Sequence, residues 1–362
     1  MNSSWAIWMK INHNYYLDLA FQLAEKNLGK TRLNPSVGSV VVKNDAVISS
    51  GVTSLNGRPH SEFNALRNLK NCSGATLYTT LEPCTHYGKT PPCVNLIIKK
   101  KIKEVYYAFE DPDIRTFKKA KQILKSKDIK SKLIPNKKYS KFYDSYFLNK
   151  KLSVPFVGAK IAVSKDYFTI NKKNKWITND YSRKIGHLIR DKYDCILSTS
   201  KSVNYDDSLL NCRIEGLNNN KPDLFIIDLN LNLKKKLSLR NLLKVRKTYL
   251  VTSKLNKEKS LEFKKFGYKI ILIDQLKSKN DYNKFFKNIY KMGYSRILFE
   301  TGLTFLNYLI KNNMINDLFI FKSSKKLGKI GKNNTSIKYL KKINPKLLTI
   351  NLNGDKLFRK IF

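Results

Sequence analysis

The chain has 362 residues, 42% of them apolar, and a formal net charge of +43. This length is typical of two domains rather than one, and the apolar fraction is sufficient for a core in each. No stretch approaches the roughly 20 apolar residues of a membrane-spanning helix, and residues 1–12 lack the apolar core of a signal peptide. We therefore expect a cytoplasmic protein with no membrane partner.

The high positive charge is common in nucleic-acid-binding proteins. Here, however, the lysines are spread along the whole chain together with abundant Asn, Ile and Tyr, a composition that an AT-rich genome favours. We expect no specific nucleic-acid partner, although the excess charge should attract anionic, phosphorylated ligands in general.

In the first part of the chain, helical and strand-like apolar patterns alternate. The predicted helices cover residues 15–28, 62–69, 93–101 and 116–125. The predicted strands cover residues 37–42, 46–52, 75–81, 105–109 and 129–134, with a turn at Asn44-Asp45 between the first two. This alternation predicts an α/β domain, which we place at residues 1–150.

The pattern restarts near Pro155 and predicts a second α/β domain over residues 151–362. Its predicted strands cover residues 156–163, 195–198, 224–228, 248–252, 270–273, 297–299 and 317–321. Its predicted helices cover residues 181–190 and 304–310, residues 213–221 form a polar loop, and a closing hairpin turns at Asn353-Gly354.

A zinc-binding pattern occupies two segments of the first domain, residues 58–62 and 82–93. His60, Cys84 and Cys93 supply three ligands suited to Zn²⁺, and three protein ligands leave one tetrahedral position to water, as in catalytic sites. A proline precedes both His60 and Cys93, so we expect these ligands in the first turns of helices. The five cysteines of the chain, an odd number, do not indicate a disulfide framework.

Glu62 follows His60 by two residues, so its side chain need not bind the metal. It is placed instead to take a proton from water and return it to a leaving amine, as in zinc nucleobase deaminases with a His-x-Glu pattern. We therefore predict Glu62 as the catalytic residue. A structural zinc site would need a fourth ligand such as Cys72 or His86, but His86 is better placed to point into the pocket.

The eight residues between Cys84 and Cys93 separate this chain from cytidine and tRNA deaminases, which have Cys-x2-Cys. The long Gly- and Pro-containing insert resembles the bifunctional riboflavin-biosynthesis deaminase/reductase family. The same family resemblance extends to residues 34–38, 74–78, 81–84 and 111–113.

For the first domain, the resemblance implies a cytidine-deaminase-like three-layer fold. It also implies hydrolytic deamination of 2,5-diamino-6-ribosylamino-4(3H)-pyrimidinone 5′-phosphate, with Asn34, His86 and Lys89 in contact with this substrate. One departure is Thr53, which stands where the family usually has a histidine.

For the second domain, the resemblance implies a dihydrofolate-reductase-like α/β fold that reduces the ribosyl group to a ribityl chain with NADPH. It rests on residues 160–164, 176–178, 188–190 and 300–304. The absence of a G-x-G-x-x-G pattern argues against a Rossmann site. The residues implied to contact NADPH are Ala162, Trp176, Ser202, Asp206, Leu229, Gly302 and Thr304. Those implied to contact the substrate are Asn174, Arg190, Leu210, Arg213 and Glu300.

Three departures from the family pattern concern the second domain. Tyr167 replaces the glycine of a Ser-x-Asp-Gly turn, Ser208 replaces the proline of Asp-Asp-Pro, and the loop between Tyr167 and Trp176 is short. They leave open a deaminase whose second domain has decayed to a structural or dimerisation role. A further alternative is a nucleic-acid-binding or RNA-editing deaminase, against which the long insert argues. Our leading hypothesis is a bifunctional zinc- and NADPH-dependent enzyme that forms a homo-oligomer.

Overall fold

A computed structural model describes residues 12–217 and 222–362 of the chain. The chain divides into two compact units, and the division falls between Lys151 and Leu152. Residues 1–11, where no signal peptide is expected, and residues 218–221, the end of the loop predicted over residues 213–221, lie outside the described residues. Among the helices that are described, none combines the length and apolar character needed to cross a bilayer.

The first unit contains every helix and strand predicted for it, with ends shifted by a few residues. The helices are α1 (His13–Asn27), α2 (Ser61–Leu66), α3 (Cys93–Lys99), α4 (Lys119–Lys125) and α5 (Asp144–Leu152). The strands are β1 (Gly38–Lys43), β2 (Ala46–Val52), β3 (Thr76–Thr79), β4 (Glu104–Tyr107) and β5 (Lys130–Leu133). Only α5 was not predicted.

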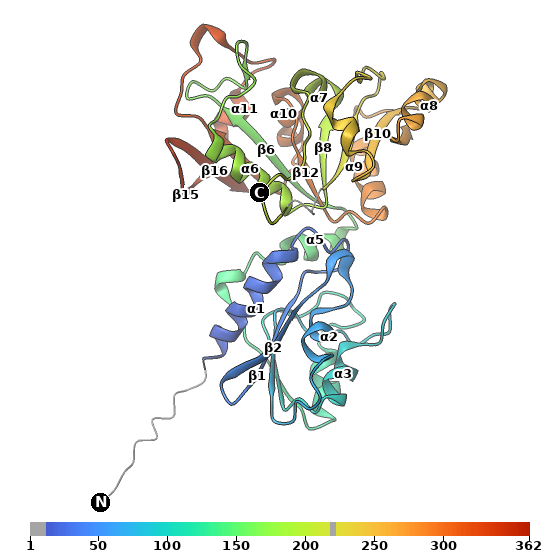
Figure 1. The fold of residues 1–362 in the computed structure, drawn as a ribbon, viewed down its shortest axis with the longest axis vertical. Helices are drawn as coiled ribbons and strands as arrows, with labels where there is room; N and C mark the ends of the chain where they lie inside the picture. The colour runs from blue at the N-terminus through green and yellow to red at the C-terminus, as the bar shows by residue number, and fades with distance from the viewer. Residues whose placement is uncertain (1–11, 218–221) are drawn as a thin grey trace, which may run out of the picture. The chain divides into compact units, whose positions relative to one another are not determined.

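These five strands form one sheet in the order β2-β1-β3-β4-β5. Strand β1 pairs antiparallel with β2 and β3, whereas β3, β4 and β5 run parallel. Successive strand residues alternate between the two faces. Val40 and Tyr78 pack in a core with α1, and Val41 and Leu77 pack in a second core with α2 and α3. Figure 1 shows the same layers, with α1 on one face and α2 and α3 on the other.

The second unit is also α/β, as predicted. Its helices are α6 (Asp180–Asp191), α7 (Ser200–Asp206), α8 (Lys257–Lys265), α9 (Lys279–Lys291), α10 (Leu303–Lys311) and α11 (Lys338–Lys342). Its strands are β6 (Phe156–Val163), β7 (Ile170–Asn171), β8 (Cys195–Thr199), β9 (Asp223–Ile227), β10 (Thr248–Ser253), β11 (Lys269–Ile273), β12 (Arg296–Phe299), β13 (Asp317–Lys322), β14 (Gly331–Lys332), β15 (Lys346–Leu352) and β16 (Asp355–Ile361).

Nine of these strands form a sheet in the order β11-β10-β9-β8-β12-β6-β13-β16-β15. All neighbours from β11 to β13 are parallel, and the hairpin β15–β16 adds two antiparallel strands at one edge. Apolar residues of α9, α10 and α11 cover one face, while residues of α7 and α8 pack in the core on the other. Parallel strands place the loops that follow them at a single edge of the sheet.

Tyr167 forms its turn without the glycine of the family pattern. Its φ is +67°, in the left-handed region that favours glycine. The ring is packed against the core of the second unit, and the Lys322 ammonium lies 4.0 Å from the ring centroid. The preceding Asp166 accepts hydrogen bonds from the backbone N–H groups of Leu327 and Gly328. These contacts hold the tyrosine in a conformation that it would rarely adopt alone.

Helix α1 lies so close to β1 that Gly38 has no room for a side chain. A Cβ atom there would lie 1.8 Å from the carbonyl oxygen of Ala20. We expect Gly38→Ala to lower the free energy of unfolding of the first unit by about 3 kcal/mol, because helix backbone cannot move aside easily. Urea unfolding checks this. Ala46→Ser, at an exposed position of β2, should leave the midpoint unchanged, and an equally unchanged midpoint for Gly38→Ala would contradict the close packing.

Candidate active site

His60, Cys84 and Cys93 come together as the sequence predicted, and their ligand atoms all lie within 4.8 Å of one another. His60 immediately precedes α2, Cys84 follows β3, and Cys93 is the first residue of α3. The two Sγ atoms lie 3.6 and 3.5 Å from the His60 Nδ1. Tetrahedral zinc, with bonds of about 2.3 Å to sulfur and 2.0 Å to nitrogen, separates such atoms by about 3.5 Å. The donor set therefore fits zinc.

The electrostatics of the two cysteines also favour a bound cation. A hydrogen bond from Cys93 and the neighbouring His60 ring lower the pKa of the Cys84 thiol to about 4, although burial opposes the charged form. The Cys84 thiolate and burial in turn raise the pKa of the Cys93 thiol. A divalent cation bound here would stabilise both thiolates, above all that of Cys93, which burial disfavours.

Glu62 is held next to the ligands on α2 and is only 4% exposed. The Ser61 hydroxyl donates a 3.0 Å hydrogen bond to its Oε2 and is itself 2.8 Å from the hydroxyl of Ser39 on β1. Burial, reinforced by the charge of Cys84, raises the pKa of the Glu62 carboxyl. A carboxylate with a raised pKa accepts a proton more readily, which suits a general base.

A cavity of about 250 Å³ lies over these residues. It is lined by His60, Glu62 and Cys84 together with the three residues expected to contact substrate in this domain, Asn34, His86 and Lys89. Asn34 donates a hydrogen bond of 2.9 Å to the carbonyl oxygen of Gly57. The Nδ1 of His86 is 3.1 Å from the hydroxyl of Thr116. Thr116 therefore orients the ring of His86, and His86 does not belong to the cluster of possible metal ligands among the described residues.

The cavity wall also carries charged residues that were not assigned from the sequence, namely Arg58, Glu82, Asp111, Asp113, Arg115 and Lys150. Asp113 pairs with Arg115 at 2.5 Å and with Lys150 at 2.9 Å, and these contacts lower the pKa of its carboxyl far below the usual value. The sequence indicated several of these positions. Asp111 and Asp113 lie in segment 111–113, which resembles the family, and Arg58 directly precedes the proline before His60. Lys150 gave no such signal, since it reaches the cavity only through the packing of α5.

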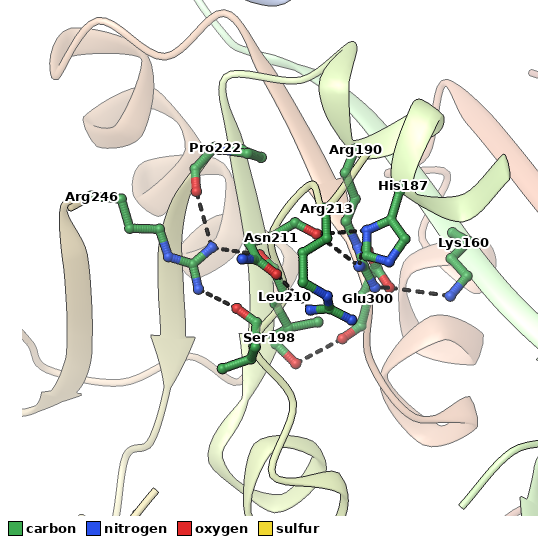
Figure 2. Close-up of polar contacts among 11 residues, drawn as sticks. Lys160, His187, Arg190, Ser198, Leu210, Asn211, Arg213, Pro222, Arg246 and Glu300 are labelled. Atoms are coloured by element: carbon green, nitrogen blue, oxygen red, sulfur yellow. Dashed lines mark hydrogen bonds and ion pairs between the residues drawn. The ribbon is translucent and has the colours of Figure 1, made fainter. Parts of the chain in front are cut away.

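A second polar site lies at the carboxyl edge of the nine-stranded sheet. Glu300, directly after β12, accepts two hydrogen bonds from Arg190 of α6, one of them 2.9 Å long from Nη2. Lys160 of β6 donates to the same carboxylate at 3.2 Å (Figure 2). Burial disfavours the charged carboxylate, but the two cations outweigh it and hold the pKa of Glu300 at about 2. Lys160 was quoted in a family segment, although its role was not predicted.

Leu210, Arg213 and Asn174 are also expected to contact the substrate, and their surroundings differ. Leu210 is buried with a φ of +47°, and Arg213 donates a 2.6 Å hydrogen bond to the Oδ1 of Asn211. The carbonyl oxygen of Asn211 in turn accepts a hydrogen bond of 3.0 Å from Arg190, which links this loop to Glu300. Asn174 lies apart in an exposed turn, where its bonds are to the neighbouring Asn171 and Trp176.

Three of the seven residues expected to contact the cofactor lie at the same edge, because each follows or ends a parallel strand. Ala162 is near the end of β6, Leu229 follows β9, and Gly302 caps the start of α10 after β12. The others lie on the adjoining helices or loops, namely Trp176 before α6, Ser202 and Asp206 on α7, and Thr304 on α10. Trp176 is 48% exposed, and the guanidinium carbon of Arg183 lies 4.5 Å from its ring centroid.

Two family descriptions match separate parts of the chain. Residues 10–109 match the cytidine and deoxycytidylate deaminase zinc-binding region. Residues 155–352 match the RibD C-terminal domain.

Relatives and solved structures cover nearly the whole chain. The riboflavin biosynthesis protein RibD of Aquifex aeolicus is 30% identical over 86% of this chain and 87% of that protein. RibD of Buchnera aphidicola is 30% identical over 88% of this chain and 88% of that protein. Acinetobacter baumannii RibD superposes with a TM-score of 0.82, at 26% identity over 96% of this chain and 98% of that one. A second solved structure is that of a Thermotoga maritima diaminohydroxyphosphoribosylaminopyrimidine deaminase/5-amino-6-(5-phosphoribosylamino)uracil reductase. It superposes with a TM-score of 0.78, at 25% identity over 96% of this chain and 97% of that one.

Removal of one of the three sulfur or nitrogen donors should remove the metal. In Cys93→Ala we expect zinc to fall from about one ion per chain to less than about a tenth, because two protein ligands hold Zn²⁺ weakly. Elemental analysis of the purified, dialysed protein measures this. Cys72→Ala removes a buried thiol outside the cluster and should keep the full zinc content. Full zinc in Cys93→Ala would show that the ligand set is wrong.

Proposed function

Because this chain belongs to the RibD family of bifunctional riboflavin-biosynthesis enzymes, which deaminate and reduce, we propose how its own residues divide and perform the two reactions. We assign the deaminase to residues 1–150 and the reductase to residues 151–362. Two observations support this division: the two family matches do not overlap, and the structural units divide within two residues of it.

The substrate that we propose for the deaminase is 2,5-diamino-6-ribosylamino-4(3H)-pyrimidinone 5′-phosphate. The Thermotoga relative is named for deamination of a diaminohydroxyphosphoribosylaminopyrimidine. The observation that carries the proposal is that one cavity combines His60, Cys84 and Cys93 with the buried Glu62 and with cationic side chains at its wall. These are the requirements of hydrolytic deamination of a phosphorylated pyrimidine.

In the deaminase, His60, Cys84 and Cys93 would hold zinc, which when bound supplies Lewis acidity that makes water easier to deprotonate. The carboxylate of Glu62 takes a proton from the water as its oxygen adds to the ring carbon that bears the amino group. It then gives this proton to the amino group, which leaves as ammonia. The remaining hydroxyl proton moves to the adjacent ring nitrogen, so that the ring carbon becomes a carbonyl. Ser61 orients the Glu62 carboxylate for both transfers. Asn34 and His86 would contact the pyrimidine ring.

In the reductase, NADPH would supply the hydride that converts the ribosyl group to a ribityl chain. We place its contacts at Ala162, Trp176, Ser202, Asp206, Leu229, Gly302 and Thr304.

In the substrate site of the reductase, Arg190 and Arg213 would bind the phosphate, while Lys160 and Glu300 would hydrogen-bond the sugar. Asn174 and Leu210 would line the same substrate site. The ion pairs of Glu300 with Lys160 and Arg190 are intact, which favours an active reductase over a second unit with only a structural role. The homo-oligomeric state and the cytoplasmic location stay predictions.

The coupled assay tests both halves of the proposal in one chain. With the diaminopyrimidine phosphate alone, the wild type should release ammonia and gain about one mass unit in the product, and with NADPH it should then gain two hydrogens. Glu62→Gln should lower the deamination rate by about 100-fold or more, because it removes the proton carrier. It should still oxidise NADPH when the deaminated product is supplied. Ammonia release that ignores Glu62→Gln would disprove the assigned base, and NADPH that is never oxidised would disprove the reductase.

We further propose that Arg58 compensates for Thr53 in binding the phosphate. Thr53 is 1% exposed, and its hydroxyl accepts a 3.0 Å hydrogen bond from the backbone N–H of Val37, so it is not free for substrate. Arg115 and Lys150 are engaged by Asp113. Arg58, in contrast, bonds the hydroxyl of Thr90, and among the described residues neither it nor Lys89 pairs with a carboxylate.

A comparison of two substrates tests the role of Arg58. We expect Arg58→Ala to raise the KM for the phosphorylated substrate by about tenfold to 100-fold, because a charged hydrogen bond contributes about 1.5–3 kcal/mol. With the dephosphorylated substrate, Arg58→Ala and the wild type should have the same KM. Arg67→Ala, at an exposed arginine after α2, serves as the control and should match the wild type. An equal loss on both substrates would place Arg58 elsewhere than at the phosphate.

A further inference from the structure

Arg246 is a buried arginine of the second unit that bonds to backbone rather than to an acid. It lies two residues before β10 and is 5% exposed. Its Nη1 donates to the carbonyl oxygens of Leu210 and, at 3.1 Å, of Pro222, while its Nη2 donates to the carbonyl oxygen of Leu209. The planar fork of a guanidinium can hold several acceptors in a fixed arrangement, which a lysine ammonium cannot reproduce.

The loop that Arg246 holds is strained. Asp207 and Leu210 both have positive φ angles, +44° and +47°, which residues with a side chain rarely adopt. Such backbone persists only where surrounding contacts over-determine it. Two of the three carbonyl oxygens that Arg246 binds belong to this loop, at Leu209 and Leu210. The guanidinium is therefore placed to keep the loop in this conformation.

The next residue of the loop, Asn211, connects it to the polar site. Its carbonyl oxygen accepts hydrogen bonds from the Nη1 of Arg190 at 3.0 Å and is 2.8 Å from the Nδ1 of His187. Its side-chain oxygen accepts a bond of 2.6 Å from Arg213. Figure 2 shows the resulting series of contacts, with Arg246 at one end and Lys160 at the other.

The charges in this region make the position of Arg246 costly. Burial and the nearby charge of Arg190 lower the pKa of Arg246 to about 10, so the group is still protonated at neutral pH. Its Nε is buried with no acceptor among the described residues. A buried cation bonded only to neutral carbonyls contributes less to stability than a paired one. Its contacts instead serve the arrangement of the loop.

We propose that Arg246 is a positioning residue of the reductase: by holding residues 209–211 it fixes Asn211, whose side chain aims the guanidinium group of Arg213 at the substrate phosphate. This inference rests on the proposed function, in which Arg213 binds that phosphate. Arg246 itself does not touch the substrate. Its effect should appear in substrate binding rather than in cofactor binding or in the deaminase.

The test is the steady-state kinetics of Arg246→Lys, which keeps the charge but loses the fork. The full-length wild type must first oxidise NADPH with 5-amino-6-(5-phosphoribosylamino)uracil, and failure of that step contradicts the proposed function rather than this inference. In Arg246→Lys we expect the KM for this substrate to rise about tenfold, with the KM for NADPH and the deaminase kinetics changed less than about twofold. A substrate KM that stays at the wild-type value, or equal losses for both reductase ligands, would overturn the proposal.

A double-mutant cycle separates positioning from general loss of structure. If Arg246 acts through Arg213, Arg246→Lys should raise the substrate KM by less than about threefold in an Arg213→Ala background. A full tenfold effect in that background would contradict the route. Arg296→Lys is the matched control, because Arg296 also donates to a backbone carbonyl, that of Lys192, and lies at the start of β12, at the sheet edge opposite Glu300; it should match the wild type.

A second variant covers the case in which the reductase unit of Arg246→Lys does not fold. Asn211→Ala leaves Arg246 in place but removes the acceptor of Arg213. We expect it to raise the KM for the pyrimidine phosphate by about tenfold without changing the KM for NADPH. An unchanged substrate KM in Asn211→Ala would show that the loop does not aim Arg213, and the proposal would fail.

Discussion

The position of β3 between β1 and β4 is the constraint on which the deaminase site depends. Strand β1 runs antiparallel to β3, with Ser39 opposite Thr79, and β4 runs parallel to it, with Thr79 opposite Tyr107. The residues before β1 therefore lie at the same sheet edge as those after β3 and β4. The strand pairing alone therefore brings the segments 34–37, 81–84 and 109–113 close together. The N-terminal ends of α2 and α3 then add His60, Glu62 and Cys93.

The second unit uses the same geometry on a larger scale. Its six neighbouring parallel strands from β10 to β13 deliver the loops after β6, β8, β9 and β12 to one edge. The polar residues of that edge come from parts of the chain up to 140 positions apart, as for Lys160 and Glu300. In both units a single buried carboxylate pairs with two cations, Asp113 in one and Glu300 in the other.

Departures from the family pattern are accommodated by tertiary contacts. Tyr167 takes the left-handed conformation of the glycine it replaces because its ring is packed in the core and lies near Lys322. Thr53 uses its hydroxyl within the fold, bonded to Val37, so any loss of substrate contact has to be met by another residue. The first change therefore leaves the local backbone intact, while the second alters which side chains can line the cavity.

The amino-acid sequence by itself determined the α/β class of both units, most element positions and the three residues that form the candidate zinc cluster. Hydrophobic periodicity and the His-x-Glu and Cys-x8-Cys spacings are local, so they can be read without knowing the fold. Helix α9 was not predicted although Tyr282, Phe285, Phe286 and Ile289 have helical spacing, and α8, whose surface is mostly charged, was not predicted either. The short helices α7 and α11 were also not predicted. Only the tertiary structure decided that Lys150 joins Asp113, that Lys160 joins Glu300, and that Arg246 holds the loop before Asn211. These contacts join residues far apart in the chain, and their formation depends on strand order and helix packing, which no local pattern encodes.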